Sequence, residues 1–300
     1  MTDGKRVITR RDFMRTGSSL AMATLMGMPL LGNTPVNRPG KSPVVLIREK
    51  KVLDGQGRPN PDILQNMLDQ ALMTLMDTPD PASAWSQLVS PTDVVAVKSN
   101  VWSYLPTPES LEATIRSRLL ETGVEEGNIV IDDRGFRRNL HLIDGATALI
   151  NVRPMRTHHW SGLGTLVKNY IMFVPRPSKY HGNACENLGS IWRLPHVAGK
   201  TRLNILVMLT PLFHGIGPHH FSRRYTWPYS GLILSRDPVA ADTSGARIIQ
   251  AKRDAFFGTQ RPIRPPPRHI AAADTRFGLG NSRPERIQLM KMGWDKGALI

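Results

Sequence analysis

Three short stretches of the sequence carry the side chains best suited to holding and transforming an anion. Each combines a cation with an amide or an imidazole, and cations bind carboxylate or phosphate groups through charge-assisted hydrogen bonds. The six side chains are Lys98, Asn100, Arg156, His158, Lys168 and Asn169. We expect the lysines, the arginine and the two amides to bind a small anionic ligand, and His158 to act as the acid or base.

A metal-dependent hydrolase built on Asp132 and His214 is an alternative. Imidazole and carboxylate are common metal ligands. The sequence, however, lacks two histidines on one helical turn followed by a carboxylate, so Asp132 and His214 stay candidates only and no metal ligand is assigned. Asp132 also suits a turn or helix cap. Asp237 and Asp242 have a local explanation, as a helix cap and a first-turn acid beside the helix dipole.

The elements that must position these side chains alternate along the chain. Short apolar runs predict strands at 44–47, 93–98, 129–131, 148–152, 203–209 and 232–234. Capping and periodic residues predict helices at 60–75, 107–123 and 237–251. This alternation indicates an α/β fold, with a mostly parallel sheet and helices on both faces. Polar residues follow most of the strands, and we expect them to converge on one edge of the sheet.

The middle of the chain is less regular. A helix is one interpretation of residues 162–174, and residues 175–200 predict a long irregular loop, because they are rich in Pro, Gly, Asn and His. Residues 258–268 predict a proline-stiffened arm.

The first 40 residues are typical of a twin-arginine signal peptide and linker, which leaves 41–300 as a single α/β domain. Arg10 and Arg11 precede Phe13, and an apolar stretch follows at 20–31. We therefore expect the twin-arginine export machinery as a partner and the periplasm as the destination. The apolar stretch is too short for a comfortable permanent span, although an uncleaved signal would remain as an anchor.

Composition narrows the choice of partners and cofactors. The chain has a formal net charge of +15, which favours anionic partners. No nucleic-acid-binding motif accompanies this charge, so nucleic acid is not expected. Cys185 is the only cysteine, which excludes an iron–sulfur cluster held by four thiolates of this chain. The identity of any cofactor stays open.

The motifs together resemble the family known as domain of unknown function 362. The markers are residues 97–100, 151–158, 162–169, 215–218, 235–242 and 278–280, in the order and spacing of that family. The chain departs from the family at Arg156, where lysine is usual, and near Met208, where an aspartate is usual. The ten-residue spacing of His158 and Lys168 is also similar to that in nickel-dependent lactate racemases, which indicates only the position of a pocket.

These features predict an exported protein that binds a small anionic ligand or cofactor in a cleft at the carboxyl ends of the strands. Whether it is also an enzyme is left open by the residues. The alternative is a non-catalytic envelope binding or accessory protein whose basic surface contacts a polymer or another protein.

Overall fold

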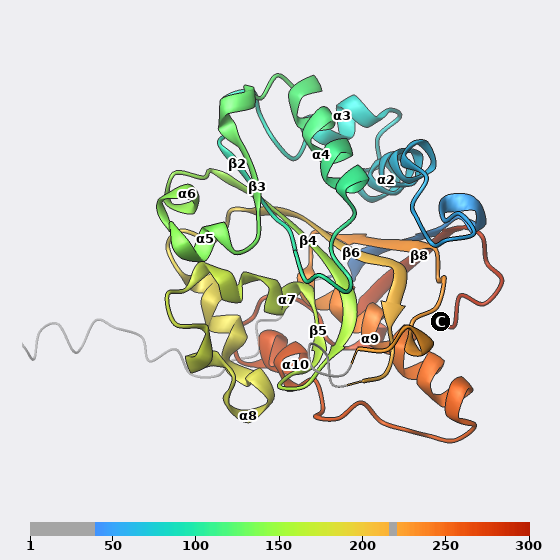
Figure 1. Ribbon diagram of the computed structural model, residues 1–300. Helices are drawn as coiled ribbons and strands as arrows, with labels where there is room; N and C mark the ends of the chain where they lie inside the picture. The colour runs from blue at the N-terminus through green and yellow to red at the C-terminus, as the bar shows by residue number, and fades with distance from the viewer. Residues whose placement is uncertain (1–39, 216–220) are drawn as a thin grey trace, which may run out of the picture. The chain divides into compact units, whose positions relative to one another are not determined.

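One eight-stranded sheet organises the computed structural model, which describes residues 40–215 and 221–300 (Figure 1). The strand order is β3-β2-β4-β6-β7-β1-β8, and β5 pairs with β4 outside this path. The strands are β1 (Ser42–Arg48), β2 (Val95–Lys98), β3 (Ile129–Asp132), β4 (Ala148–His158), β5 (Gly162–Gly164), β6 (Thr201–Leu212), β7 (Gly231–Ser235) and β8 (Ile287–Gly293). Four of the seven strand pairings are parallel. The predicted α/β fold with a mostly parallel sheet is confirmed.

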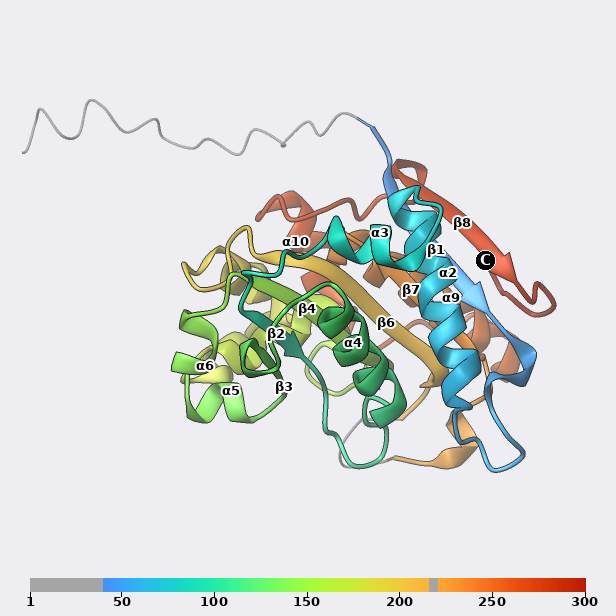
Figure 2. The same ribbon diagram turned by 90° about the horizontal axis from the view of Figure 1, so that it is seen from above.

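Helices cover both faces of the sheet, as the two views show (Figures 1 and 2). On one face lie α2 (Pro61–Met76), α3 (Pro81–Ser86) and α4 (Glu109–Glu121). The opposite face packs against α5 (Gly135–Arg138), α6 (His141–Asp144), α7 (Leu166–Asn169), α9 (Pro238–Phe257) and α10 (Arg268–Thr275). Side chains alternate between the faces along each strand, so β1 sends Val45 into one apolar cluster and Val44 into the other.

Two long helices begin where the sequence predicts. The Asn60 side chain accepts a hydrogen bond from the backbone N–H of Ile63, and Pro61 is the first residue of α2. Asp237 accepts from the N–H groups of Val239 and Ala240 at the start of α9. Both predicted caps are therefore confirmed.

The direction of β7 corrects one expectation about the site. This strand runs antiparallel to both β6 and β1, so its carboxyl end lies at the edge where the other strands begin. Asp237 follows β7 and accepts a hydrogen bond from Ser42 at the start of β1. It therefore lies away from the polar residues that follow β2, β3 and β4.

The middle of the chain is more ordered than predicted. Strand β4 continues to His158 instead of ending near residue 152, and it turns back as β5. Gly162 makes this turn at φ +72°, and a Cβ there would lie 2.0 Å from the carbonyl oxygen of Pro265. In place of the helix considered for 162–174, the chain forms β5, α7 and a 3₁₀ turn at Tyr170–Phe173. Short helical turns, including α8 (Gly182–Cys185), fill much of the predicted loop at 175–200.

Several predictions lie on residues outside the described part of the chain. These include the signal residues Arg10, Arg11 and Phe13, and most of the family marker at 215–218. Among the helices of the described residues, none combines the length and the apolar character needed to cross a bilayer.

Candidate functional site

The site lies at a topological switch point of the sheet. β2 and β4 are parallel neighbours, but the chain leaves β2 toward β3 on one side and leaves β4 toward β6 on the other. The two connections diverge, which opens a crevice at the carboxyl ends of the two strands. Ligands of open α/β sheets bind in such crevices.

A pocket of roughly 230 Å³ occupies this crevice, and we call it the switch-point pocket. Its lining comes from the loop after β2, the start of α5, strand β4, helix α7 and the turns that follow it. The lining residues are Asn100, Trp102, Asp133, Arg134, Arg137, Arg153, Arg156, His158, Trp160, Lys168, Asn169, Ile171, Met172, Pro177 and His181. They include five Lys or Arg side chains and one carboxylate. The volume is below the roughly 300–1,000 Å³ of drug-sized sites, so it suits a small ligand.

Lys98 lies beneath this pocket and does not line it. Its ammonium group is fully buried and donates to Asp133 Oδ1 at 2.5 Å and to the carbonyl oxygen of Ser99 at 2.6 Å. Burial lowers the pKa of Lys98 to about 8 against the opposing effect of Asp133. Burial alone would raise the pKa of Asp133, but the positive charge of Lys98 and its hydrogen bond outweigh this effect, and the pKa of Asp133 is lowered. Lys98 therefore supports the floor of the pocket through its ion pair with Asp133, whereas the sequence predicts it among the residues that line the pocket.

Asn169 joins three segments of the site. Its Nδ2 donates to the carbonyl oxygens of Lys98 and Val152 and to Asn151 Oδ1, at 2.9–3.1 Å. Its Oδ1 accepts from Arg153 at 3.3 Å. Because these bonds use both ends of the amide, Asn169 holds β2, β4 and α7 together.

The two arginines of β4 are the unusual feature of the pocket. Both side chains are almost completely buried, and within residues 40–215 and 221–300 neither forms a salt bridge. In the same residues, Arg156 has no acceptor for Nε and Nη1, and Arg153 has none for Nε. The Arg156 guanidinium lies over the Trp102 ring, 4.1 Å from its centroid. Buried charges are normally paired, so these donors lack a partner that an anion would supply.

Lys168 adds a third buried cation. Its Nζ donates to Cys185 Sγ at 3.6 Å, and burial lowers the pKa of its ammonium group to about 8. Arg153 and Arg156 contribute to that shift through charge repulsion. Lys168 is the third residue of the short helix α7, and it lines the same pocket as the β4 arginines.

His158 is placed to donate a hydrogen bond. Its Nδ1 accepts from the backbone N–H of Trp160 at 3.2 Å, which leaves the proton of the neutral ring on Nε2. Burial, and then the positive charges of Lys168 and Arg156, lower the pKa of His158 far below its usual range. The ring is therefore neutral when the pocket is empty, and its predicted role as acid or base would need a bound anion to raise the pKa.

Asn100 lies in the same pocket as predicted. Its backbone is fixed by two hydrogen bonds to Thr107, and its side chain is mostly buried. Within the described residues its Oδ1 accepts no hydrogen bond, so this amide is available to a ligand.

The two metal candidates are in different surroundings. Asp132 Oδ1 accepts from the N–H groups of Asp133 and Gly135, which fixes the turn into α5. His214 contacts Arg253 and packs against the rings of Tyr225 and Phe257 in another pocket. In the described part of the chain, no three His, Cys, Asp or Glu side chains are grouped to hold a metal ion.

Asp242 is the positioning residue that the sequence did not reveal. Its carboxylate is fully buried and accepts from the backbone N–H groups of Leu166 and Val167, at 2.8 and 2.9 Å. It therefore caps α7 from helix α9, 75 residues later in the chain, and fixes the turn that carries Lys168. From the sequence, Asp242 was interpreted only as an acid in the first turns of its own helix. A cap on a distant helix leaves no local sequence pattern.

Asp242→Asn is expected to lower the free energy of unfolding by about 1–3 kcal/mol, because the amide leaves a backbone N–H without an acceptor. Anion affinity should fall as well, since the turn that carries Lys168 loosens. Chemical denaturation and calorimetric titration with oxalate measure the two effects. Asp237→Asn is the matched control, because Asp237 caps α9 itself at the far edge of the sheet. A normal oxalate affinity in Asp242→Asn would contradict the positioning role.

The pKa of Lys168 gives the site a predictable pH dependence. Below about pH 8 the ammonium group is charged and attracts an anion, and above it the amine is neutral. The affinity for oxalate, whose charge is constant over this range, should fall about tenfold between pH 7 and pH 9. Lys168→Met should reduce this dependence. An affinity that rises with pH in the wild type would contradict the assignment.

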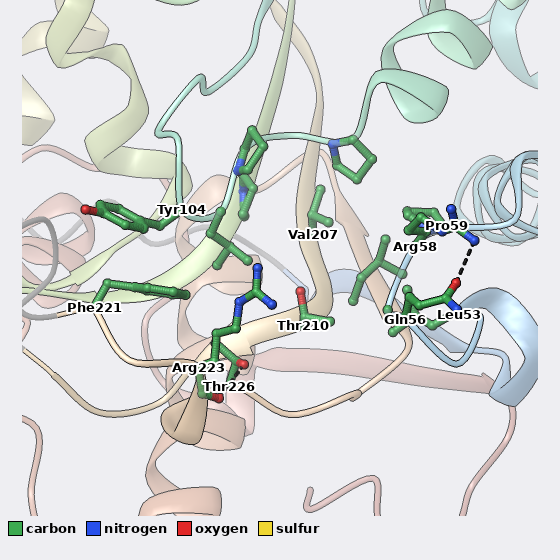
Figure 3. A pocket seen from close by; sticks show the side chains of 16 residues that line it. Leu53, Gln56, Arg58, Pro59, Tyr104, Val207, Thr210, Phe221, Arg223 and Thr226 are labelled. Atoms are coloured by element: carbon green, nitrogen blue, oxygen red, sulfur yellow. Dashed lines mark hydrogen bonds between the residues drawn. The ribbon is translucent and has the colours of Figure 1, made fainter.

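A second pocket, of roughly 430 Å³, lies at the same edge of the sheet (Figure 3). Proline, leucine, valine and aromatic side chains dominate its wall, and the rings of Tyr104 and Phe221 stack with centroids 4.9 Å apart. Its cations, Arg58 and Arg223, are exposed to solvent and need no ligand to compensate them. The smaller switch-point pocket is therefore the better candidate for an anion.

Part of this site lies in a segment that matches a known family model. Residues 138–247 match the family model described as domain of unknown function DUF362. The matched DUF362 segment contains Arg153, Arg156, Lys168 and Asp242, whereas Asn100 and Trp102 lie before it. The resemblance drawn from sequence motifs is confirmed over this range. No curated protein and no solved structure matches the chain.

Proposed function

We propose that this protein binds a small carboxylate or phosphate compound in the switch-point pocket. The observation that carries the proposal is a set of three buried cations that form no salt bridge with any described residue, Arg153, Arg156 and Lys168. An uncompensated buried charge costs several kcal/mol, and a bound anion removes that penalty by ion pairing. The guanidinium groups also offer the planar donor pairs that carboxylates and phosphates accept.

Titration of the full chain with oxalate and with inorganic phosphate tests this proposal. We expect saturable binding of one anion per chain by calorimetry, and the binding should weaken only modestly with salt because the site is buried. Absence of saturable binding of either anion would refute the proposal. Weak, non-saturating and strongly salt-dependent binding would instead favour the rival function, an envelope accessory protein that uses its exposed basic surface.

We further propose that residues 1–40 are a twin-arginine signal peptide and linker, and that the α/β domain of residues 41–300 acts in the periplasm. The support is the order of Arg10, Arg11 and Phe13 ahead of an apolar stretch. This route carries folded proteins, so the domain would fold, and could load its anion, before export.

Replacing Arg10 and Arg11 together by lysine should leave nearly all of the protein in the cytoplasm. The charge of the segment is unchanged, so a loss of export would show that the guanidinium groups are recognised. Fractionation and immunoblotting of the bacterial host measure the distribution. The control is Arg15→Lys, which keeps the pair intact and should be exported normally. An undiminished periplasmic yield of the double variant would contradict the export route.

A further inference from the structure

The two buried lysines of the site have different partners. Lys98 forms an ion pair with Asp133, whereas Lys168 forms no ion pair with any described residue. The acceptor of Lys168 Nζ is a thiol, Cys185 Sγ, and not a carboxylate. Lys168 lines the switch-point pocket and Lys98 does not, so Lys168 is the amine that faces a bound ligand.

The surroundings of Lys168 favour its neutral form. The side chain is nearly completely buried. Four arginines share its pocket wall, Arg134, Arg137, Arg153 and Arg156, and the one carboxylate there, Asp133, is already paired with Lys98. Desolvation and neighbouring cations both promote loss of the ammonium proton, and a lysine activated in this way is a nucleophile toward carbonyl carbon. The lowered pKa of Lys168, about 8, agrees with this geometry.

We propose that Lys168 forms an imine with a small carbonyl compound whose anionic group is held by Arg156, of which a 2-oxo acid is the simplest example. This inference rests on the proposed anion site. The lysine nitrogen adds to the carbonyl carbon and forms a C–N bond. The carbonyl C–O bond then breaks, and the oxygen leaves as water with the two protons of the neutral amine. The product is a C=N bond, so no oxidant or reductant is required.

Several features of the pocket suit this reaction. Arg156 and Lys168 come from different elements and line one small cavity, so a compound of a few atoms could contact both. His158 also lines the cavity, and its Nε2–H can donate to the carbonyl oxygen. Holding the carboxylate beside the amine converts a bimolecular addition into an intramolecular one, which favours Lys168 over exposed lysines.

Reductive trapping tests the inference on the full chain. The protein is incubated with pyruvate or glyoxylate, treated with cyanoborohydride, and examined by intact mass measurement and peptide mapping. We expect one stable adduct per chain on Lys168, formed faster than adducts on the exposed Lys50, Lys51 and Lys179. Oxalate, which has no reactive carbonyl group, should suppress it. Trapping should increase as the pH rises through about 8, because the neutral amine reacts.

A lysine variant and oxalate binding together distinguish failure of the imine from failure of the anion site. Lys168→Arg should lose the adduct, since a guanidinium keeps the charge but cannot form this imine, and mapping of the wild type gives the same answer if that variant fails to fold. An adduct distributed over the exposed lysines, or none on Lys168, would overturn the imine. If oxalate still binds in that case, only this inference fails. Failure of oxalate to bind would overturn the anion site as well.

Discussion

Replacing Arg156 by methionine is expected to weaken anion binding strongly and, at the same time, to raise the stability of the anion-free protein. Loss of a buried charge partner typically costs about 2–5 kcal/mol of binding, so oxalate affinity should fall roughly 30-fold or more. In the empty pocket, however, Arg156 is a desolvated cation whose Nε and Nη1 find no acceptor among the described residues. An apolar side chain of similar length removes that penalty and can still pack on Trp102.

The gain in stability should be about 1–4 kcal/mol, as when other buried ionic groups are replaced by apolar ones. In anion-free buffer this corresponds to a rise in Tm of at least about 2 °C. Arg134→Met is the matched control, since Arg134 lines the same pocket but is exposed, and it should change Tm little. Differential scanning calorimetry with and without oxalate measures both effects. A destabilised Arg156→Met that binds oxalate normally would show that Arg156 is a structural residue.

Asp133→Asn should be the most destabilising single change in the site. It leaves the Lys98 ammonium fully buried without its ion-pair partner, and breaking a buried pair on one side costs about 3–5 kcal/mol. By contrast, Glu126→Gln breaks an exposed pair with Arg116 and should cost less than about 1 kcal/mol. Lys98→Met combined with Asp133→Leu removes both charges and should recover much of the lost stability.

The loss of stability in Asp133→Asn should become smaller as the pH rises. Burial already lowers the pKa of Lys98 below its unfolded value, and removing Asp133 lowers it further. The unfolded chain then binds a proton that the folded chain does not, so stability increases with pH up to the unfolded pKa of lysine, near 10.5. Urea denaturation of Asp133→Asn at pH 7 and pH 9.5 should show a smaller deficit at the higher pH. An equal deficit at both would contradict the ion-pair explanation.

Local signals in the sequence were sufficient for much of the fold. Asn60 with Pro61, and Asp237 with Pro238, predicted the starts of α2 and α9, because a cap and a first-position proline act on the nearest turn. The apolar runs predicted six strands of the sheet. β8, at the edge of the sheet, escaped prediction because its burial is only partial.

Long-range pairing was not predictable from the same signals. Nothing in Gly231–Ser235 indicates whether β7 runs with or against its neighbours, so Asp237 was expected at the wrong edge. The length of β4 was also missed. Pairing with β5 extends the strand, and the extension turns Arg153 and Arg156 into wall residues of the pocket.

The chemistry of the site was predictable by residue type, but not by role. Asn100, Arg156, His158, Lys168 and Asn169 line one pocket, as the strand-end argument anticipated. Lys98 and Asn169 prove to be structural supports, because a buried partner for each comes from a distant segment. The cap that Asp242 forms on α7 could not be predicted for the same reason.

The most direct test of anion binding in the switch-point pocket is the crystallographic location of an oxyanion. Crystals of the full chain grown or soaked with arsenate, a phosphate analogue with a strong anomalous signal, would show where the anion binds. We predict an anomalous peak in the switch-point pocket, within hydrogen-bonding distance of Arg156 and Lys168, that is lost in Arg156→Met. Arsenate bound only at exposed basic residues, with the pocket cations left without an anion, would contradict the account.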